Sequence, residues 1–167
     1  MPTCFWFLLT PKMERSQSEM INRVLVAVDG SENSMRAVEL AAEVTTKFEA
    51  EMSIIHVVSK IKIPEELEKF AKVEKIEESP EYLMLDEIGH KILDKAESVA
   101  KQKGIRKIRK IIRQGDPANE IIKFAKENQI DSVFLGSRGL SEIKSLLFGS
   151  VSNKVCNLAS TNCVTVR

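Results

Sequence analysis

The sequence predicts a doubly wound α/β fold, and three observations support that prediction. Short apolar runs of strand length recur along the chain, amphipathic segments of helical length separate them, and glycine, aspartate or proline stands at most of the junctions. Strands that alternate with helices pair in parallel, because each helix carries the chain back across the sheet. We therefore expect a five-stranded parallel sheet, with helices on both of its faces.

The composition is typical of one globular domain. The chain has 167 residues, 43% of them hydrophobic and 29% charged, which suffices to bury a core without metal or disulfides. Its net charge of +1 offers no broad basic surface and argues against a nucleic-acid binder. The three cysteines form no CxxC pair and lie near no histidine at metal-ligand spacing, so we expect neither a zinc site nor a disulfide. With no apolar run long enough to span a bilayer, these features favour a cytoplasmic protein that does not enter the membrane.

Residues 1–20 are predicted to form an N-terminal extension, and residues 21–167 to form a single domain. The extension opens with an apolar hexad that contains three aromatic residues, and the segment after it has neither helical nor strand periodicity. Two explanations stay open. Translation could begin at Met13 or Met20, or the aromatic residues could cover an apolar patch on this subunit or a neighbour.

The first strand is predicted at residues 24–28, a continuous apolar run typical of a strand buried on both faces. Ser31 or Ser34 can cap the helix that follows, whose apolar residues recur every three to four positions up to about Phe48. The second strand, at residues 52–58, is apolar and rich in β-branched residues. A strand, a helix and a strand in this short span form a βαβ crossover, so the two strands should be parallel.

Residues 59–80 are the least regular part of the chain, and we expect an excursion at the rim with a short helix at residues 65–73. A long helix follows at about residues 81–103 and ends before Gly104. The third strand, at residues 105–113, is rich in arginine and lysine. We interpret it as an edge strand, where charged side chains deter unwanted pairing. The alternative is a basic stripe facing RNA or a membrane, which the lack of interleaved aromatic residues disfavours.

The last third of the chain supplies the remaining elements. Asp116 is expected to cap a helix that has Pro117 at its first position. The fourth strand is predicted at residues 131–135, the last helix at residues 149–159 and the fifth strand at residues 162–166. In the strand order 3-2-1-4-5 the first and fourth strands are neighbours. Their carboxyl ends then meet at the crevice where open parallel sheets bind ligands.

Three glycines and a serine at this crevice predict a phosphate-binding loop. Gly136 and Gly139 follow the fourth strand, and Gly149 and Ser150 begin the last helix. Glycine lets the backbone approach a ligand closely, and a helix start turns N–H groups and a partial positive charge toward an anion. Each residue alone could serve a turn or a helix cap, but their spacing favours a phosphate cradle. Asp29 ends the first strand beside the loop, where it could face the ligand or cap a helix.

The spacing Gly136, two residues, Gly139, nine residues, Gly149, Ser150 resembles the nucleotide-binding motif of the universal stress protein family. The apolar runs of the first two strands and the segment Gly-Asp-Pro-Ala before the third main helix resemble that family as well. The resemblance covers about residues 22–167. It implies a fold of the adenine nucleotide alpha hydrolase type.

The resemblance also implies a ligand, namely ATP, with AMP or another adenine nucleotide as alternatives and Mg²⁺ accompanying the nucleotide. Asp29 would lie near the ribose and adenine end, and the backbone around Met52, Leu135 and Gly136 would border the base. The residues implied at the phosphates are Gly139, Gly149, Ser150 and Ser152, with Val151 between the last two.

The candidate site shows no evident catalytic apparatus. No glycine-rich loop ends in Gly-Lys-Ser/Thr, which excludes a P-loop, and no general base or nucleophile with a supporting partner stands near the cradle. Arg138 and Lys144 lie inside the loop and could either reach a triphosphate or remain solvated. His56, inside an apolar strand, is interpreted as a core histidine.

Our preferred hypothesis is an ATP-binding regulatory or stress-response protein, in which nucleotide occupancy controls conformation or partner binding with little or no hydrolysis. One alternative is a slow ATP-hydrolysing or adenylate-transferring enzyme that uses Asp29 to place a metal and Arg138 or Lys144 to stabilise charge. Another is a ligand-free dimeric interaction module. The resemblance further implies a homodimer formed through residues 162–166, an edge strand with unpaired backbone groups. It does not identify a protein partner or a signal.

Overall fold

The computed structural model describes residues 21–59, 80–139 and 149–167. The N-terminal extension, the short helix predicted at residues 65–73 and Lys144 lie outside these ranges. The elements in chain order are β1 (Arg23–Ala27), α1 (Glu32–Phe48), β2 (Glu51–Val58), α3 (Pro80–Gln102), β3 (Ile108–Gln114), α4 (Pro117–Glu127), β4 (Ser132–Gly136), α5 (Ser150–Leu158) and β5 (Asn162–Val166).

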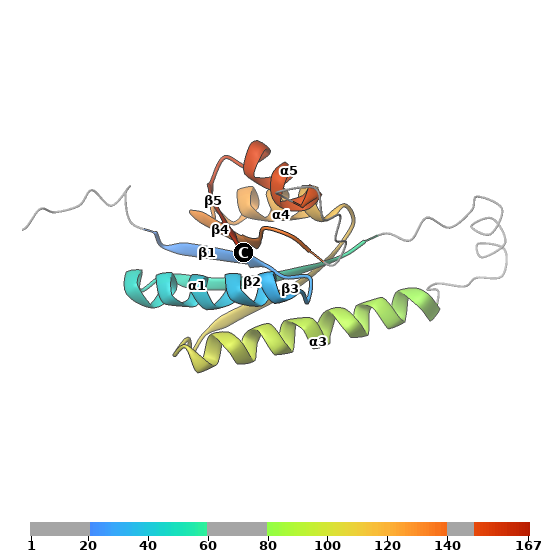
Figure 1. Cartoon of the computed structure of the whole chain (residues 1–167), viewed down its shortest axis with the longest axis horizontal. Helices are drawn as coiled ribbons and strands as arrows, with labels where there is room; N and C mark the ends of the chain where they lie inside the picture. The colour runs from blue at the N-terminus through green and yellow to red at the C-terminus, as the bar shows by residue number, and fades with distance from the viewer. Residues whose placement is uncertain (1–20, 60–79, 140–148) are drawn as a thin grey trace, which may run out of the picture.

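The five strands form one sheet in which every pair is parallel, with the order β3-β2-β1-β4-β5. Helices α1 and α3 cover one face of this sheet, and α4 and α5 cover the other (Figure 1). The predicted fold class and strand order are therefore confirmed. Among the described residues no helix is both long and apolar enough to cross a bilayer.

The sequence of the central strand β1 follows from its position, because its two faces pack into two separate cores. Val24 and Val26 face the core that α1 and α3 cover, whereas Leu25 and Ala27 face the core that α4 and α5 cover. Since alternate residues of a strand point to opposite faces, both sets of positions must be apolar. The result is the uninterrupted apolar run, with the side chains from Val24 to Val26 fully buried.

The basic strand β3 lies at one edge of the sheet, as predicted. Its cations form pairs with neighbouring helices. The Lys110 ammonium lies 2.8 Å from carboxylate oxygens of both Asp94 and Glu97, and Arg113 lies 3.4 Å from Glu127. The carboxylates raise the pKa of Lys110 above its ordinary value, mainly through hydrogen bonds. β5 forms the opposite edge.

One expectation from the sequence is wrong, since Cys156 of α5 and Cys163 of β5 form a disulfide. The two residues are seven apart, which is not a spacing that marks a bridge by itself. The chain reverses direction after α5, and this reversal brings the two Cα atoms to 5.4 Å, within the ordinary range for a disulfide.

Candidate functional site

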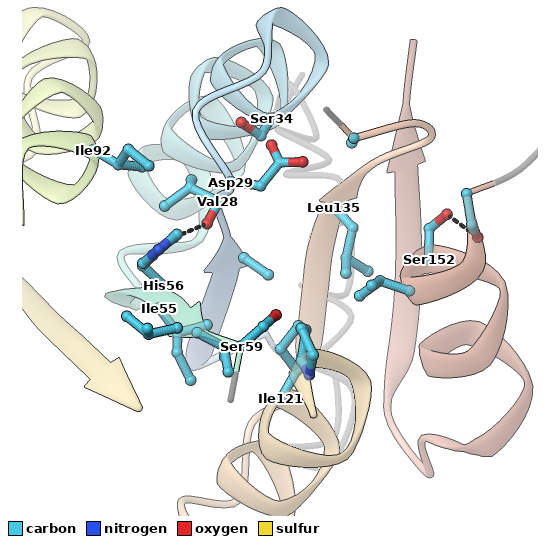
Figure 2. Close-up of a pocket in the computed structure, with 18 of the residues that line it drawn as sticks. Val28, Asp29, Ser34, Ile55, His56, Ser59, Ile92, Ile121, Leu135 and Ser152 are labelled. Atoms are coloured by element: carbon cyan, nitrogen blue, oxygen red, sulfur yellow. Dashed lines mark hydrogen bonds between the residues drawn. The ribbon is translucent and has the colours of Figure 1, made fainter. Parts of the chain in front are cut away.

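A cavity of about 430 Å³ opens at the carboxyl ends of β1, β2 and β4. Its walls are the ends of these strands, part of α3 and the first turn of α5, and Figure 2 shows side chains from these elements converging on it. The residues predicted from the sequence that line it are Asp29, Leu135, Gly136, Arg138, Gly139, Gly149, Ser150, Val151 and Ser152.

Within the described ranges, Met52 is the one predicted site residue that does not line the cavity. It lies near the start of β2, where it is buried and pairs with Val24 and Ile108. Parallel strands present their carboxyl ends to the crevice, and Val57 stands roughly 16 Å further along β2 at about 3.3 Å per residue. The residues of β2 and the segment after it that line the cavity are Ile55, His56, Val57, Val58 and Ser59.

The cradle is held together at the carbonyl oxygen of Ser137. This oxygen accepts a hydrogen bond from the backbone N–H of Gly149 at 2.7 Å, and the Ser152 hydroxyl lies 3.1 Å from it. The N–H of Ser137 in turn donates to the carbonyl of Val166 in β5 at 2.6 Å. Ser152 is buried, so its hydroxyl contributes to the scaffold of the cradle as well as to its wall. The start of α5 is thereby fixed to the ends of β4 and β5.

The first turn of α5 is built to receive an anion. Gly149 is its N-cap residue, with φ −69° and ψ 156°, and no side chain of the described residues caps this helix. The N–H groups of a first turn have no partner within their own helix, and together with the helix dipole they favour a negative charge. The start of α5 therefore lies at the cavity without a capping side chain from the described residues.

Close packing requires glycine at two positions of the loop. A Cβ atom at Gly136 would lie 2.9 Å from the backbone N of Ser34 and 3.0 Å from the backbone C of Asn33, at the start of α1. A Cβ at Gly139 would collide with Oδ2 of Asp29. The glycines thus allow the loop after β4 to pack directly on the segment after β1.

Asp29 supports the cap of α1 without being the cap itself, and it also borders the cavity. Its Oδ1 accepts hydrogen bonds from the Ser31 N–H at 3.0 Å and from the Ser31 hydroxyl at 2.6 Å. Ser31, not Asp29, is the N-cap of α1, with its hydroxyl accepting from the Ser34 N–H at 3.2 Å. Asp29 therefore orients the residue that caps α1, while its carboxylate also lines the cavity.

His56 borders the cavity, which its interpretation as a core histidine did not anticipate. Its Nδ1 donates a hydrogen bond to the Val28 carbonyl at 2.8 Å (Figure 2). Its ring packs against Gly89 of α3, where a Cβ would lie only 2.8 Å from Cδ2. The half-buried ring is thus held between β1 and α3. The wall that α3 provides, through Leu85, Ile88 and Ile92, also has no local signal in the sequence, because it depends on this docking.

Charged groups surround the cavity unevenly. Arg138 is half-buried and is the only lysine or arginine among the described residues that line it. Asp116 lies just before the lining residue Pro117 and accepts a hydrogen bond from the Asn119 N–H at 2.9 Å and from Lys154 at 3.1 Å. The Asn119 N–H first, and then Lys154, hold the pKa of Asp116 below its ordinary value. The described residues contain no cluster of three or more His, Cys, Asp or Glu suited to a metal ion.

Similar sequences cover nearly the whole chain. The family model described as the universal stress protein family matches residues 20–167. Universal stress protein YxiE of Bacillus subtilis strain 168 is 36% identical over 155 residues, which cover 89% of this chain and 100% of that protein. Universal stress protein MJ0531 of Methanocaldococcus jannaschii is 29% identical over 92% of this chain and 86% of its own length.

Solved structures of similar proteins match the fold of this chain. The structure of protein MJ0577, also from Methanocaldococcus jannaschii, has a TM-score of 0.70 and 25% identity over 88% of this chain and 96% of that one. A universal stress protein solved in complex with cAMP has a TM-score of 0.62 and 25% identity over 87% of this chain and 96% of that one. Because the family model spans most of the chain and a relative matched over its full length is 36% identical, the chain belongs to the universal stress protein family.

Proposed function

We propose that this chain binds an adenine nucleotide, ATP first among the candidates, in the cavity at the carboxyl end of its sheet. Membership of the universal stress protein family supports the proposal, as does the 25% identical universal stress protein that was solved in complex with cAMP. The single observation that carries it is the glycine-bordered cavity that contains the start of α5, where no side chain of the described residues caps the helix.

The phosphates belong at the start of α5 in this proposal. Gly139, Gly149 and Ser150 offer backbone that a phosphate can approach closely, and Ser150 is exposed. Arg138 adds a guanidinium that suits a phosphate, because its N–H groups can form two parallel hydrogen bonds. Mg²⁺ would accompany a triphosphate.

The base belongs in the opposite, apolar part of the cavity. There the end of β2 contributes Val57 and Val58, and α3 contributes Ile88 and Ile92. A purine ring is flat and largely apolar on its faces, so aliphatic walls of this kind suit it. Asp29, between the two parts, would lie near the ribose.

We propose a regulatory role in which binding matters more than turnover. Asp29 and His56 are the two residues of the described lining that could act as general bases, and both already bond to protein groups, Ser31 and the Val28 carbonyl. The nucleotide would instead connect α3 and α5, which cover opposite faces of the sheet and both line the cavity. Occupancy would then control their arrangement and the choice of a partner.

Calorimetry on the purified chain tests the proposal. We expect ATP with Mg²⁺ to bind the parent, and Gly149→Val and Ser150→Val to weaken binding by about tenfold or more, because a branched side chain would fill the phosphate position. Ser160→Val makes the same change at an exposed position that does not line the cavity, and it should bind like the parent. A parent that binds no adenine nucleotide, or equal affinities in all four proteins, would refute the proposal.

A turnover assay separates the regulatory protein from the slow enzyme. Phosphate release from ATP by the parent should stay near the rate in buffer alone. A rate well above it, and lost in Gly149→Val, would favour the ATP-hydrolysing alternative.

We also propose that β5 mediates a homodimer, since it is an edge strand whose outer side has no neighbouring strand in the described part of the sheet. Sedimentation at micromolar concentration should give a dimer. A monomer across that range would contradict this part of the proposal.

A further inference from the structure

The disulfide between Cys156 and Cys163 joins the last turn of α5 to the start of β5. α5 has nine residues, and Ser152 and Val155 are its buried ones. A helix this short rests on few buried side chains, with Val151 beside them against the core under α4 and α5, so restraints at its ends strongly influence its position. The covalent bond at its far end is therefore a major restraint on its position.

The bridge closes a ring that passes through the cradle. From Cys156, α5 leads back to Gly149 and Ser152, which contact the Ser137 carbonyl at 2.7 and 3.1 Å. From Cys163, β5 leads forward to Val166, whose carbonyl accepts the Ser137 N–H at 2.6 Å. Both elements that hold the cradle at one end are thus tied to each other at the opposite end. If the bridge opened, the added mobility would reach the phosphate position through both α5 and β5.

One side of the bridge faces the surface. Cys156 is exposed, as are Asn157 and Leu158 next to it, whereas Cys163 is half-buried and packs against the core beneath α4 and α5. Exchange requires a thiolate to reach one sulfur of the disulfide. The Cys156 side provides that access.

We propose that Cys156 and Cys163 form a thiol–disulfide exchange site whose closed state strengthens nucleotide binding at the start of α5. Only the effect on nucleotide binding rests on the proposed function; the exchange site itself does not. The co-reactant is a dithiol, either a small molecule or a protein. Closing the bridge fixes α5 against β5 before the nucleotide arrives, so less ordering remains to be done on binding.

The exchange balances as follows. A thiolate of the dithiol attacks the sulfur of Cys156, the bond between Cys156 and Cys163 breaks, and Cys163 leaves as a thiolate that takes up a proton. The second thiol of the reductant then attacks the mixed disulfide and releases Cys156, which also ends as a thiol. Two electrons and two protons pass to the protein, and the dithiol becomes a disulfide. Oxidation reverses each step.

The test uses the full chain with Cys4→Ser, so that the pair supplies the only two thiols. One sample is oxidised with glutathione disulfide and another reduced with dithiothreitol. Alkylation followed by intact mass measurement counts the free thiols, and we expect none in the first and two in the second. Calorimetry with ATP should give about fivefold weaker binding after reduction. Amide hydrogen exchange in α5 should become faster.

The control adds Cys156→Ser and Cys163→Ser to the same background. It should bind ATP with the weaker affinity in both reagents. Free thiols that persist after oxidation would overturn the exchange site, and equal affinities in the two states of the parent would overturn its coupling to the nucleotide. A chain that binds no adenine nucleotide in either state would refute the proposed function and the coupling with it. In that case the count of free thiols and the amide hydrogen exchange of α5 would still confirm or refute the thiol–disulfide exchange site.

Discussion

At the carboxyl end of the sheet a cavity of about 430 Å³ is bordered by glycine backbone and a helix start, whereas the amino end has a broader depression of about 960 Å³ bordered by charged side chains. The larger depression is the poorer candidate, because its polar groups bind one another. Arg23 donates to the carbonyl of Asn128 at 3.0 Å and to Gln129 at 3.3 Å, and Arg109 donates to the Asn128 side chain at 3.0 Å.

The two ends also differ in the reason why glycine is required there. Gly104, at the amino end, has φ +93°, and a Cβ there would meet no atom within 4 Å, so it serves a turn. Gly136 and Gly139, at the carboxyl end, are needed because other parts of the chain pack against them. Volume alone therefore does not distinguish the two ends, whereas the reason for the glycine at each end does. Substitutions at the two ends test this difference.

Gly136→Ala should have the largest effect on stability. Its Cβ would meet backbone atoms of Ser34 and Asn33 at 2.9 and 3.0 Å, which cannot move aside without shifting the start of α1. We expect the free energy of unfolding to fall by about 3 kcal/mol, as for other overpacked sites. Gly104→Ala has only the backbone strain of its positive φ and should lose about 1 kcal/mol. Urea unfolding of both variants measures the two losses, and equal losses would remove the distinction between the glycines.

Gly139→Ala should act mainly on binding. The added Cβ would collide with the carboxylate of Asp29 and push the loop or the carboxylate away from the cavity. We expect ATP affinity to fall by about tenfold, or roughly 1.4 kcal/mol. Gly104→Ala is the matched control at the other end and should bind like the parent. If calorimetry shows that Gly104→Ala weakens ATP as much as Gly139→Ala does, the ligand does not distinguish the two ends.

The sequence placed residues correctly at the carboxyl-end cavity where the prediction depended on order along the chain. The alternation of strands and helices predicts a parallel sheet, and the expected order 3-2-1-4-5, which the sheet has, places Asp29 beside Gly136 and Gly139. The prediction from the sequence failed where two elements that are distant in the sequence must pack together. The packing of α3 on His56 through Gly89 decides which residues of that helix line the cavity, and no local pattern records this contact.

Two further differences from the expectations have separate causes. Met52 was assigned to the site although it is the second residue of β2, and only the last residues of a parallel strand reach the carboxyl end. The disulfide was missed because the spacing of Cys156 and Cys163 becomes meaningful only once the chain is known to reverse between helix and strand.

Asp116 provides a test by pH at the carboxyl end. Its folded pKa lies below its ordinary value, because it accepts hydrogen bonds from the Asn119 N–H and from Lys154. A carboxyl group of lowered pKa adds stability that is complete above its unfolded pKa and is lost as the pH falls through the folded one. Asp116→Asn keeps an oxygen for the Asn119 N–H but cannot titrate. We therefore expect the stability difference between parent and variant, measured by urea unfolding, to be constant from pH 7 to about 5 and to shrink below about 4.

The control for that measurement is Glu32→Gln, a charge removal at the exposed first turn of α1. A difference that stays constant down to pH 2 in Asp116→Asn would show that the hydrogen bonds of Asp116 do not distinguish its charged form.

Arg23→Ala at the amino end should have the smallest effect and sharpens the comparison most directly. Its guanidinium makes two hydrogen bonds within the depression, at 3.0 and 3.3 Å, but its side chain is 46% exposed, so water replaces much of what is lost. We expect the free energy of unfolding to fall by less than about 1 kcal/mol and ATP affinity to stay within about twofold of the parent, which is the spread expected for a site without coupling. Arg138→Ala removes an arginine from the carboxyl-end cavity instead. It should show the opposite pattern, with weaker ATP binding and a nearly unchanged free energy of unfolding. If calorimetry and urea unfolding give the two variants the same profile, the charged groups at the amino end cannot be purely structural.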